Sequence, residues 1–148
     1  MDKLTYAMDK LTYAKDKLKS GRHSLVVLAD CNTIISDGAG IRPLLEAAEA
    51  VGSASEIWAA DTMVGKAAAM LYVLMGAKGV FAQVISQSAT AVFDRFGIAY
   101  RYDTLTEHII NRQGDGLCPM EQAVRDIEEP EQAKQAILQT IERLKHKP

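Results

Sequence analysis

One stretch near the middle of the chain, residues 57–76, limits the choice of fold more than any other. It starts with a short apolar run that predicts a buried strand, and it continues without a spacer into a helical segment that is apolar on nearly every side. A helix without a polar face belongs in the interior of a domain. Asp61 and Lys66 stand at the opening turn of this predicted helix. Because α/β proteins tend to bind ligands where a strand leads into a helix N-terminus, we expect a site there.

Composition narrows the class of protein. The 148 residues suffice for one domain with a core, and 48% apolar and 24% charged residues are typical of a soluble globular chain. A net charge of −2 argues against nucleic acid or an anionic membrane as the main partner. No apolar run is long enough to span a bilayer and there is no apolar signal core, so we expect a cytoplasmic protein in which Cys31 and Cys118 are reduced.

A tandem repeat marks the N-terminus, where residues 2–7 and 9–14 are identical. Leu4, Leu11 and Leu18 recur every seven residues and form one stripe of an amphipathic helix. Too few heptads follow for a coiled coil, so a packed helix is expected. The identity of the copies indicates either a recent duplication or an artefactual extension. We therefore separate this N-terminal helix, residues 1–19, from a single domain that includes the remaining residues, 20–148.

The order of predicted elements indicates the fold class. Two strands close together in sequence, at 24–29 and 33–36, predict an antiparallel hairpin. Helices and strands then alternate, which predicts crossover connections. Together they predict a three-layer α/β/α fold with a mixed five-stranded sheet. The later elements are a helix at 41–51, a strand from 57, a helix opening at 61, strands at 80–85 and 98–102, and helices at 86–96, from 118 and at 131–145.

Three segments carry a resemblance to a known fold, namely residues 40–46, residues 60–68 and residues 109–121 with Gly114, Gly116 and Cys118-Pro119. With these segments, the chain resembles an uncharacterised prokaryotic family of domain-of-unknown-function proteins with a cytidine deaminase-like fold. The resemblance covers roughly residues 25–124. It implies the fold and little about activity.

The chain departs from catalytic deaminases in its metal ligands. Those enzymes carry His-x-Glu at one helix opening and Pro-Cys-x-x-Cys at the next. Here the corresponding openings read Ile41-Arg42-Pro43 and, in residues 61–64, Asp-Thr-Met-Val. A zinc site needs three or four convergent nitrogen or sulfur ligands. We therefore expect no metal, no cofactor and no zinc-dependent deamination.

Four residues at the central junction are candidates for the site. Asp61 is either a cap of the predicted helix or a catalytic carboxylate. Thr62, Gly65 and Lys66 share one small-residue face if the helix begins at residue 61. Lys66 either extends to solvent or faces a cavity, and the sequence slightly favours the cavity, where the lysine binds an anion or acts as a nucleophile.

Two further segments offer polar groups beside predicted helix N-termini. Asp37, Gly38, Gly40 and Arg42 precede or open a helix in an arrangement that can hold phosphate or carboxylate, although an ordinary tight connection has the same pattern. A second segment places Cys118 ahead of a helix, a position that favours a reactive thiolate.

Arg112 lies in the glycine-containing loop before Cys118 and adds a positive charge. The alternative for Cys118 is a small buried thiol that only fills space. These two interpretations of the cysteine stay open at the level of sequence.

Three functional hypotheses follow. The first is a zinc-free protein that binds a small anionic or nucleotide-like metabolite between the openings of the helices at Arg42 and Thr62. The second is a transferase or hydrolase that uses Cys118 or Lys66 as a nucleophile, with Asp61 as a further catalytic candidate. The third is a non-catalytic regulatory module, a homodimer supported by the apolar helix and the N-terminal leucine stripe.

Overall fold

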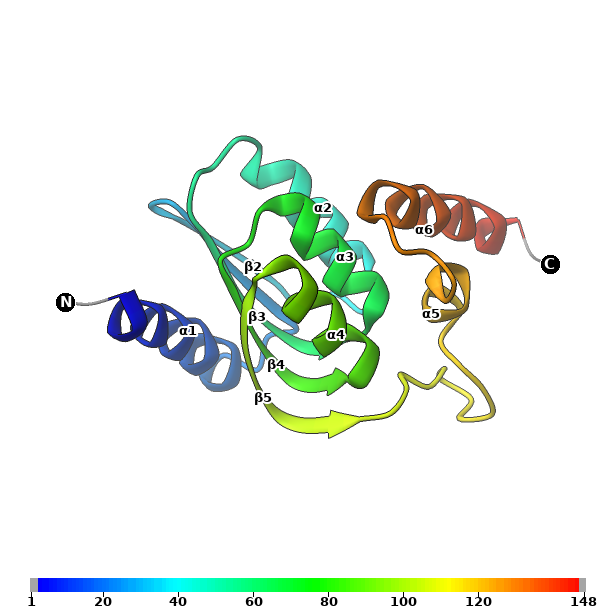
Figure 1. Cartoon of the computed structure of the whole chain (residues 1–148), viewed down its shortest axis with the longest axis horizontal. Coiled ribbons are helices and arrows are strands. Elements are labelled where there is room, and N and C mark those ends of the chain that lie inside the picture. Colours follow the sequence, from blue (N-terminus) through cyan, green and yellow to red (C-terminus); the bar gives the residue numbers. More distant parts are fainter. Residues whose placement is uncertain (1–2, 147–148) are drawn as a thin grey trace.

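The computed structural model describes residues 3–146 and shows one mixed five-stranded sheet with helices on both faces (Figure 1). This confirms the predicted α/β class and the five-stranded sheet. The helices are α1 (Lys3–Ser20), α2 (Arg42–Val51), α3 (Lys66–Met75), α4 (Gln87–Phe96), α5 (Pro119–Val124) and α6 (Pro130–Lys145). The strands are β1 (Leu25–Ala29), β2 (Asn32–Ser36), β3 (Ile57–Val64), β4 (Gly79–Ser86) and β5 (Ala99–Thr106).

The strand order across the sheet is β2-β1-β3-β4-β5. The predicted hairpin is present, because β1 pairs antiparallel with β2, and β1 also pairs antiparallel with β3. The strands β3, β4 and β5 run parallel, joined by the crossover helices α3 and α4. All five residues of β1 are buried, as its continuous apolar sequence requires of a central strand. Among residues 3–146, no helix is both long and apolar enough to cross a membrane.

The helix α1 covers one face of the sheet on its own (Figure 1). Leu11 and Leu18 of the predicted stripe are buried, and Ala14 between them is fully covered. They pack against the sheet residues Val26, Leu28, Trp58, Ala60 and Phe81. The side chains of the first repeat copy, including Leu4, lie outside the part of the chain that the structure describes. The N-terminal helix is therefore a layer of the domain and shares its core.

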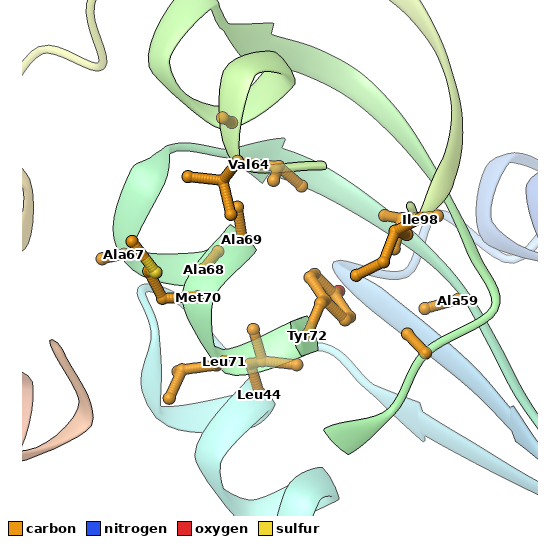
Figure 2. Packing of buried hydrophobic residues seen from close by; sticks show 14 of the residues in the cluster. Leu44, Ala59, Val64, Ala67, Ala68, Ala69, Met70, Leu71, Tyr72 and Ile98 are labelled. Carbon is orange, nitrogen blue, oxygen red and sulfur yellow. The ribbon is translucent and has the colours of Figure 1, made fainter. Parts of the chain in front are cut away.

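The helix α3 lies at the centre of the second core, between the sheet and the C-terminal helices (Figures 1 and 2). Its first seven residues are buried, which fits a helix with no polar face. Leu44 of α2 packs on one side, Phe93 of α4 on another, and Ile137 of α6 covers the outer side. The helix therefore lies in the interior of the domain, as its lack of a polar face predicts.

The predicted start of this helix at Asp61 is wrong. Residues 61–64 continue β3, and the helix begins at Lys66 after Gly65. The parallel pairing with β4 extends to Val64 opposite Ile85, so pairing with a distant strand decides the conformation of this segment. Thr62 and Lys66 consequently do not share a helical face. Similarly, β5 continues to Thr106, beyond the predicted end at residue 102.

The packing of α1 gives the first prediction. Leu18→Ala should lower the free energy of unfolding by about 2 to 5 kcal/mol, because Leu18 is only 1% exposed and its removal leaves a cavity under the sheet. Urea unfolding followed by circular dichroism measures the change. Tyr13→Ala on the same helix is the matched control, since Tyr13 is 54% exposed and should cost under about 1 kcal/mol. Equal, small effects of both changes would show that α1 does not pack on the sheet.

Candidate functional site

The N-terminus of α3 binds a carboxylate from a distant part of the chain. Gly65 precedes the helix and has no side chain that could cap it. Instead, the Lys66 amide donates a hydrogen bond to Oε1 of Glu121 at 2.7 Å, and the Ala67 amide donates to Oε2 at 2.9 Å. Both carboxylate oxygens are thus held by successive N–H groups that have no partner inside the helix. The positive end of the helix dipole adds to this attraction.

The role of Gly65 is to let this carboxylate approach the helix. A Cβ atom at residue 65 would overlap the carboxylate group of Glu121. The backbone of Gly65 has a φ of −101°, which any residue can adopt, so space and not conformation demands glycine here. Any larger residue at this position would require the Glu121 carboxylate to shift.

The side chain of Lys66 points to the connection between α5 and α6. Its ammonium group donates a hydrogen bond to the carbonyl oxygen of Arg125 at 3.0 Å and lies 3.7 Å from Oε1 of Glu128. The residue is 9% exposed. The ammonium group therefore binds other parts of the protomer, whereas the sequence slightly favoured a lysine that faces a cavity. It ties the first turn of α3 to the end of α5.

Asp61 does not cap α3, contrary to one of its two expected roles. It lies in β3 between Leu25 and Ala82 on the neighbouring strands, and its Oδ2 accepts a hydrogen bond from the Tyr72 hydroxyl at 2.7 Å. Desolvation by burial raises the pKa of Asp61 from 3.8 to about 6, against the opposing effect of the Tyr72 hydrogen bond. Burial and the nearby Asp61 charge raise the pKa of Tyr72 well above 10.

The segment before α2 lies beside the end of β3. The imidazole Nδ1 of His23 is 2.6 Å from Oδ1 of Asp37, and the Gly38 amide donates to Oγ of Ser36 at 3.1 Å. Ser24 connects this segment to β3, because its hydroxyl donates to the Ser36 carbonyl and its own carbonyl accepts from the Thr62 amide.

The remaining predicted binding residues, Gly40, Arg42 and Arg112, are all exposed. Gly40 adopts a φ of +77°, which favours glycine, and Arg42 is the first residue of α2. Arg112 lies on the exposed loop before α5. Within residues 3–146, no hydrogen bond or ion pair links Arg42 or Arg112 to the N-terminus of α3.

Cys118 is the residue immediately before α5 and is half-buried. Its amide donates to the carbonyl of Ile109, and the loop between them is organised by the side chain of Asn111, which accepts hydrogen bonds from the amides of Gly114 and Asp115. This loop fixes the start of α5 and thereby delivers Glu121 to α3. Among the described residues, no group of three or more His, Cys, Asp or Glu side chains is placed to hold a metal ion.

Two surface hollows lie at the other end of β3, near the β1–β2 turn. One is about 390 Å³ and is bordered by α1, and the other is about 200 Å³ and is bordered by the end of α2. Asp30 and Asn32 line both, and none of the predicted site residues lines either. At the polar junction of α3, the carboxylate of Glu121 occupies the first two amides of the helix.

The sequence interpretation missed the partner of Glu121. Glu121 was not among the predicted site residues, whereas the structure places its carboxylate at the N-terminus of α3. The sequence does contain a signal that α3 lacks a local cap. Gly65 stands immediately before the helix, three alanines follow Lys66, and no Ser, Thr, Asp or Asn immediately precedes the helix. A buried helix start without a local cap requires a cap from elsewhere in the chain.

The raised pKa of Asp61 gives the second prediction. Since the native state holds this proton more tightly than the unfolded state, Asp61 makes the protein less stable as pH rises from about 4 to about 6. Asp61→Asn should remove that loss and raise the free energy of unfolding at pH 7.5 by about 1 to 2 kcal/mol, with little gain at pH 4. Urea unfolding at both pH values measures the difference.

The exposed Asp126 provides a control with the same change in charge, and Asp126→Asn should show no comparable dependence on pH. A loss of stability in Asp61→Asn at pH 7.5 would show that the Tyr72 hydrogen bond to a charged Asp61 outweighs the cost of burial.

The comparisons with known proteins agree with this fold. Residues 13–141 match the family model described as "Domain of unknown function (DUF1893)". The chain is also similar to the crystal structure of a DUF1893 family protein from Thermotoga maritima, with a TM-score of 0.80 and 24% sequence identity over 97% of this chain and 92% of that chain. No curated protein matches the sequence. Because the family model covers most of its length, the chain belongs to the DUF1893 family.

Proposed function

We propose that the protein binds a small anionic or nucleotide-like metabolite at the N-terminus of α3, and that Glu121 occupies the position of the ligand's anionic group in the unliganded protein. One observation carries the proposal, namely that two successive backbone amides, those of Lys66 and Ala67, bind both oxygens of a carboxylate. The same pair of amides suits a phosphate or a carboxylate of a ligand equally well.

The surroundings of these amides support an anion position. Gly65 leaves room for a group with several oxygens, and Lys66 places a positive charge within the first turn of the helix. The segment with Asp37, Gly38, Gly40 and Arg42 borders the end of β3 through the contacts of Ser24 with Ser36 and Thr62. Its arginine is exposed and bound to no other charged group among the described residues, so it can contribute to a ligand.

The element that carries Glu121 is suited to movement. The helix α5 has six residues and follows a loop with two glycines, Gly114 and Gly116. Leaving the two amides that Glu121 binds without an acceptor costs about 1 to 3 kcal/mol. The binding free energy of a metabolite with a phosphate and a few further contacts can exceed that cost. Glu121 therefore competes with the ligand for the two amides, and an ion that binds weakly does not displace it.

The cytidine deaminase-like fold is part of the same proposal. It is supported by the opening helix, the antiparallel hairpin and the parallel strands that follow, in the order β2-β1-β3-β4-β5. In a fold of that kind, the openings of α2 and α3 supply the metal ligands of the catalytic members. Here those openings read Arg42-Pro43 and Gly65-Lys66. The proposed anion position thus takes the place of the metal position.

A catalytic role for Lys66 or Cys118 has less support. A nucleophilic lysine needs a free amine, and the Lys66 ammonium group donates to Arg125 and lies near Glu128. Cys118 has no histidine among the hydrogen-bonding partners that the structure gives it. A binding function therefore agrees better with the geometry than a transferase or hydrolase does.

The third prediction tests the anion position. Glu121→Ala should lower the free energy of unfolding by about 1 to 3 kcal/mol, because it leaves two buried amides without an acceptor. Inorganic phosphate should then restore stability at constant ionic strength. A dissociation constant of about 10 mM gives back about 1.4 kcal/mol at about 100 mM phosphate. Thermal unfolding across a phosphate series measures this effect.

Glu49→Ala is the matched control, because Glu49 is exposed on α2 and its removal changes the net charge equally. If phosphate stabilises Glu121→Ala no more than it stabilises Glu49→Ala, the amides do not form an anion site and the proposed function fails. The intact protein is then tested with adenosine monophosphate, for which a thermal shift is expected in the wild type and a larger one in Glu121→Ala.

A further inference from the structure

The strand β5 forms an open edge of the sheet (Figure 1). It pairs with β4 on one side, and among residues 3–146 no strand pairs with its other side. Six of its eight residues are exposed, including two large apolar side chains, Tyr102 at 43% and Leu105 at 44% exposure. An exposed edge of this length offers hydrogen-bonding groups to a further strand.

The backbone direction along β5 follows from its first residue. The Ala99 amide donates to the carbonyl of Lys78, on the side of β4. Because backbone groups alternate in direction along a strand, Tyr100, Tyr102 and Thr104 point their N–H and C=O groups away from β4. Together with Thr106, which has the same direction, these residues present the unpaired row of donors and acceptors.

The charged side chains of β5 are arranged symmetrically around Tyr102. Arg101 and Asp103 flank it and share the sheet face that α1 covers, since Arg101 is in register with Phe81 and Lys19 of α1 reaches Asp103 at 2.6 Å. Arg101 has no ion-pair partner within the described part of the chain. The strand thus carries one unpaired positive charge and one fixed negative charge, two residues apart.

We propose that β5 pairs antiparallel with β5 of a second copy of this chain, with the two-fold axis at Tyr102. Arg101 then lies opposite the partner's Asp103, and Asp103 lies opposite the partner's Arg101. Tyr102 lies opposite the partner's Tyr102, and Thr104 lies opposite the partner's Tyr100. The outward backbone groups of these residues exchange hydrogen bonds with the partner strand. The exposed Leu105 meets the partner's Ala99. The sheets of the two copies become one continuous sheet.

The charges select this register over its neighbours. A shift of two residues in one direction places Arg101 opposite the partner's Arg101, and a shift in the other direction places Asp103 opposite the partner's Asp103. Opposite charges across a strand pair attract and like charges repel. In the proposed register the Arg101 pairs occupy non-hydrogen-bonded positions, where side chains of antiparallel strands lie closer together. Asp103 then lies between Lys19 of its own chain and the partner's Arg101.

The other candidate surfaces fit a second copy less well. Leu11, Leu18 and the first seven residues of α3 are buried within the protomer, so the leucine stripe and the apolar helix are not available for a dimer. The opposite sheet edge, β2, is five residues long and carries no charged residue that could fix a register. The edge at β5 is eight residues long, and its Arg101 and Asp103 are placed to pair with the opposite charges of a second β5.

The experiment measures the mass of the full chain in solution by sedimentation over a wide range of concentrations. The wild type should dimerise. Arg101→Glu and Asp103→Arg should each weaken self-association at least about tenfold, because each makes all charged pairs across the interface alike.

Mixing the two variants should restore dimers as heterodimers. The glutamate introduced in one variant would face the arginine introduced in the other, and the native Asp103 of the first would face the native Arg101 of the second. Lys134→Glu on the exposed surface of α6 is the control for net charge and should dimerise like the wild type.

Thr104→Pro provides a second test that does not depend on charge. Proline at this position removes an outward N–H group and leaves the pairing with β4 intact, so the variant should stay folded by circular dichroism and become monomeric. A wild type that is monomeric throughout the concentration range overturns the proposal. So does a wild-type dimer that neither Arg101→Glu nor Thr104→Pro weakens, and so does a mixture of the two charge variants that forms no heterodimer.

Discussion

The carboxylate of Glu121 at the N-terminus of α3 joins the buried central helix to the C-terminal helices. The helix α3 is buried almost completely, so its first amides cannot be satisfied by water. No residue next to it supplies a cap, and Glu121 binds the amides of Lys66 and Ala67 from 54 or 55 residues away. A buried helix of alanine and large apolar residues is possible here because its polar end is bound by a distant acid.

The same contact helps to fix α5 and α6 against α3. Lys66 binds the carbonyl of Arg125 just after α5, and Arg95 of α4 binds the carbonyl of Glu128 in the connection to α6. Beyond this connection, Ala133 and Ile137 of α6 cover the outer side of α3. The polar junction and the apolar cover therefore reinforce each other. A ligand that displaces Glu121 would loosen α5 first, while α1 and the sheet stay in place.

Local patterns predicted most of the fold and the position of the candidate site, but not the contacts within that site. Three local patterns each predict an element and its burial. They are the continuous apolar run of β1, the leucine spacing of α1 and the apolar sequence of α3. The boundary at Asp61 was missed because pairing of Val64 with Ile85 overrides the local pattern. The uncapped start of α3 indicated that a cap must come from elsewhere in the chain, but no local pattern identified Glu121, 54 or 55 residues away, as that cap. The contact of Tyr72 with Asp61 also depends on how α3 packs on β3, which local patterns do not specify.

Hydrogen exchange at the amides of Lys66 and Ala67 measures whether Glu121 binds the first two amides of α3. The first N–H groups of a helix have no partner within the helix, so without an external acceptor they exchange quickly once water reaches them. We expect the amides of Lys66 and Ala67 to exchange slowly in the wild type. Glu121→Gln should accelerate both relative to the amide of Ala69, which donates to the carbonyl of Gly65. Fast exchange of Lys66 and Ala67 in the wild type, or no acceleration in Glu121→Gln, would contradict this expectation.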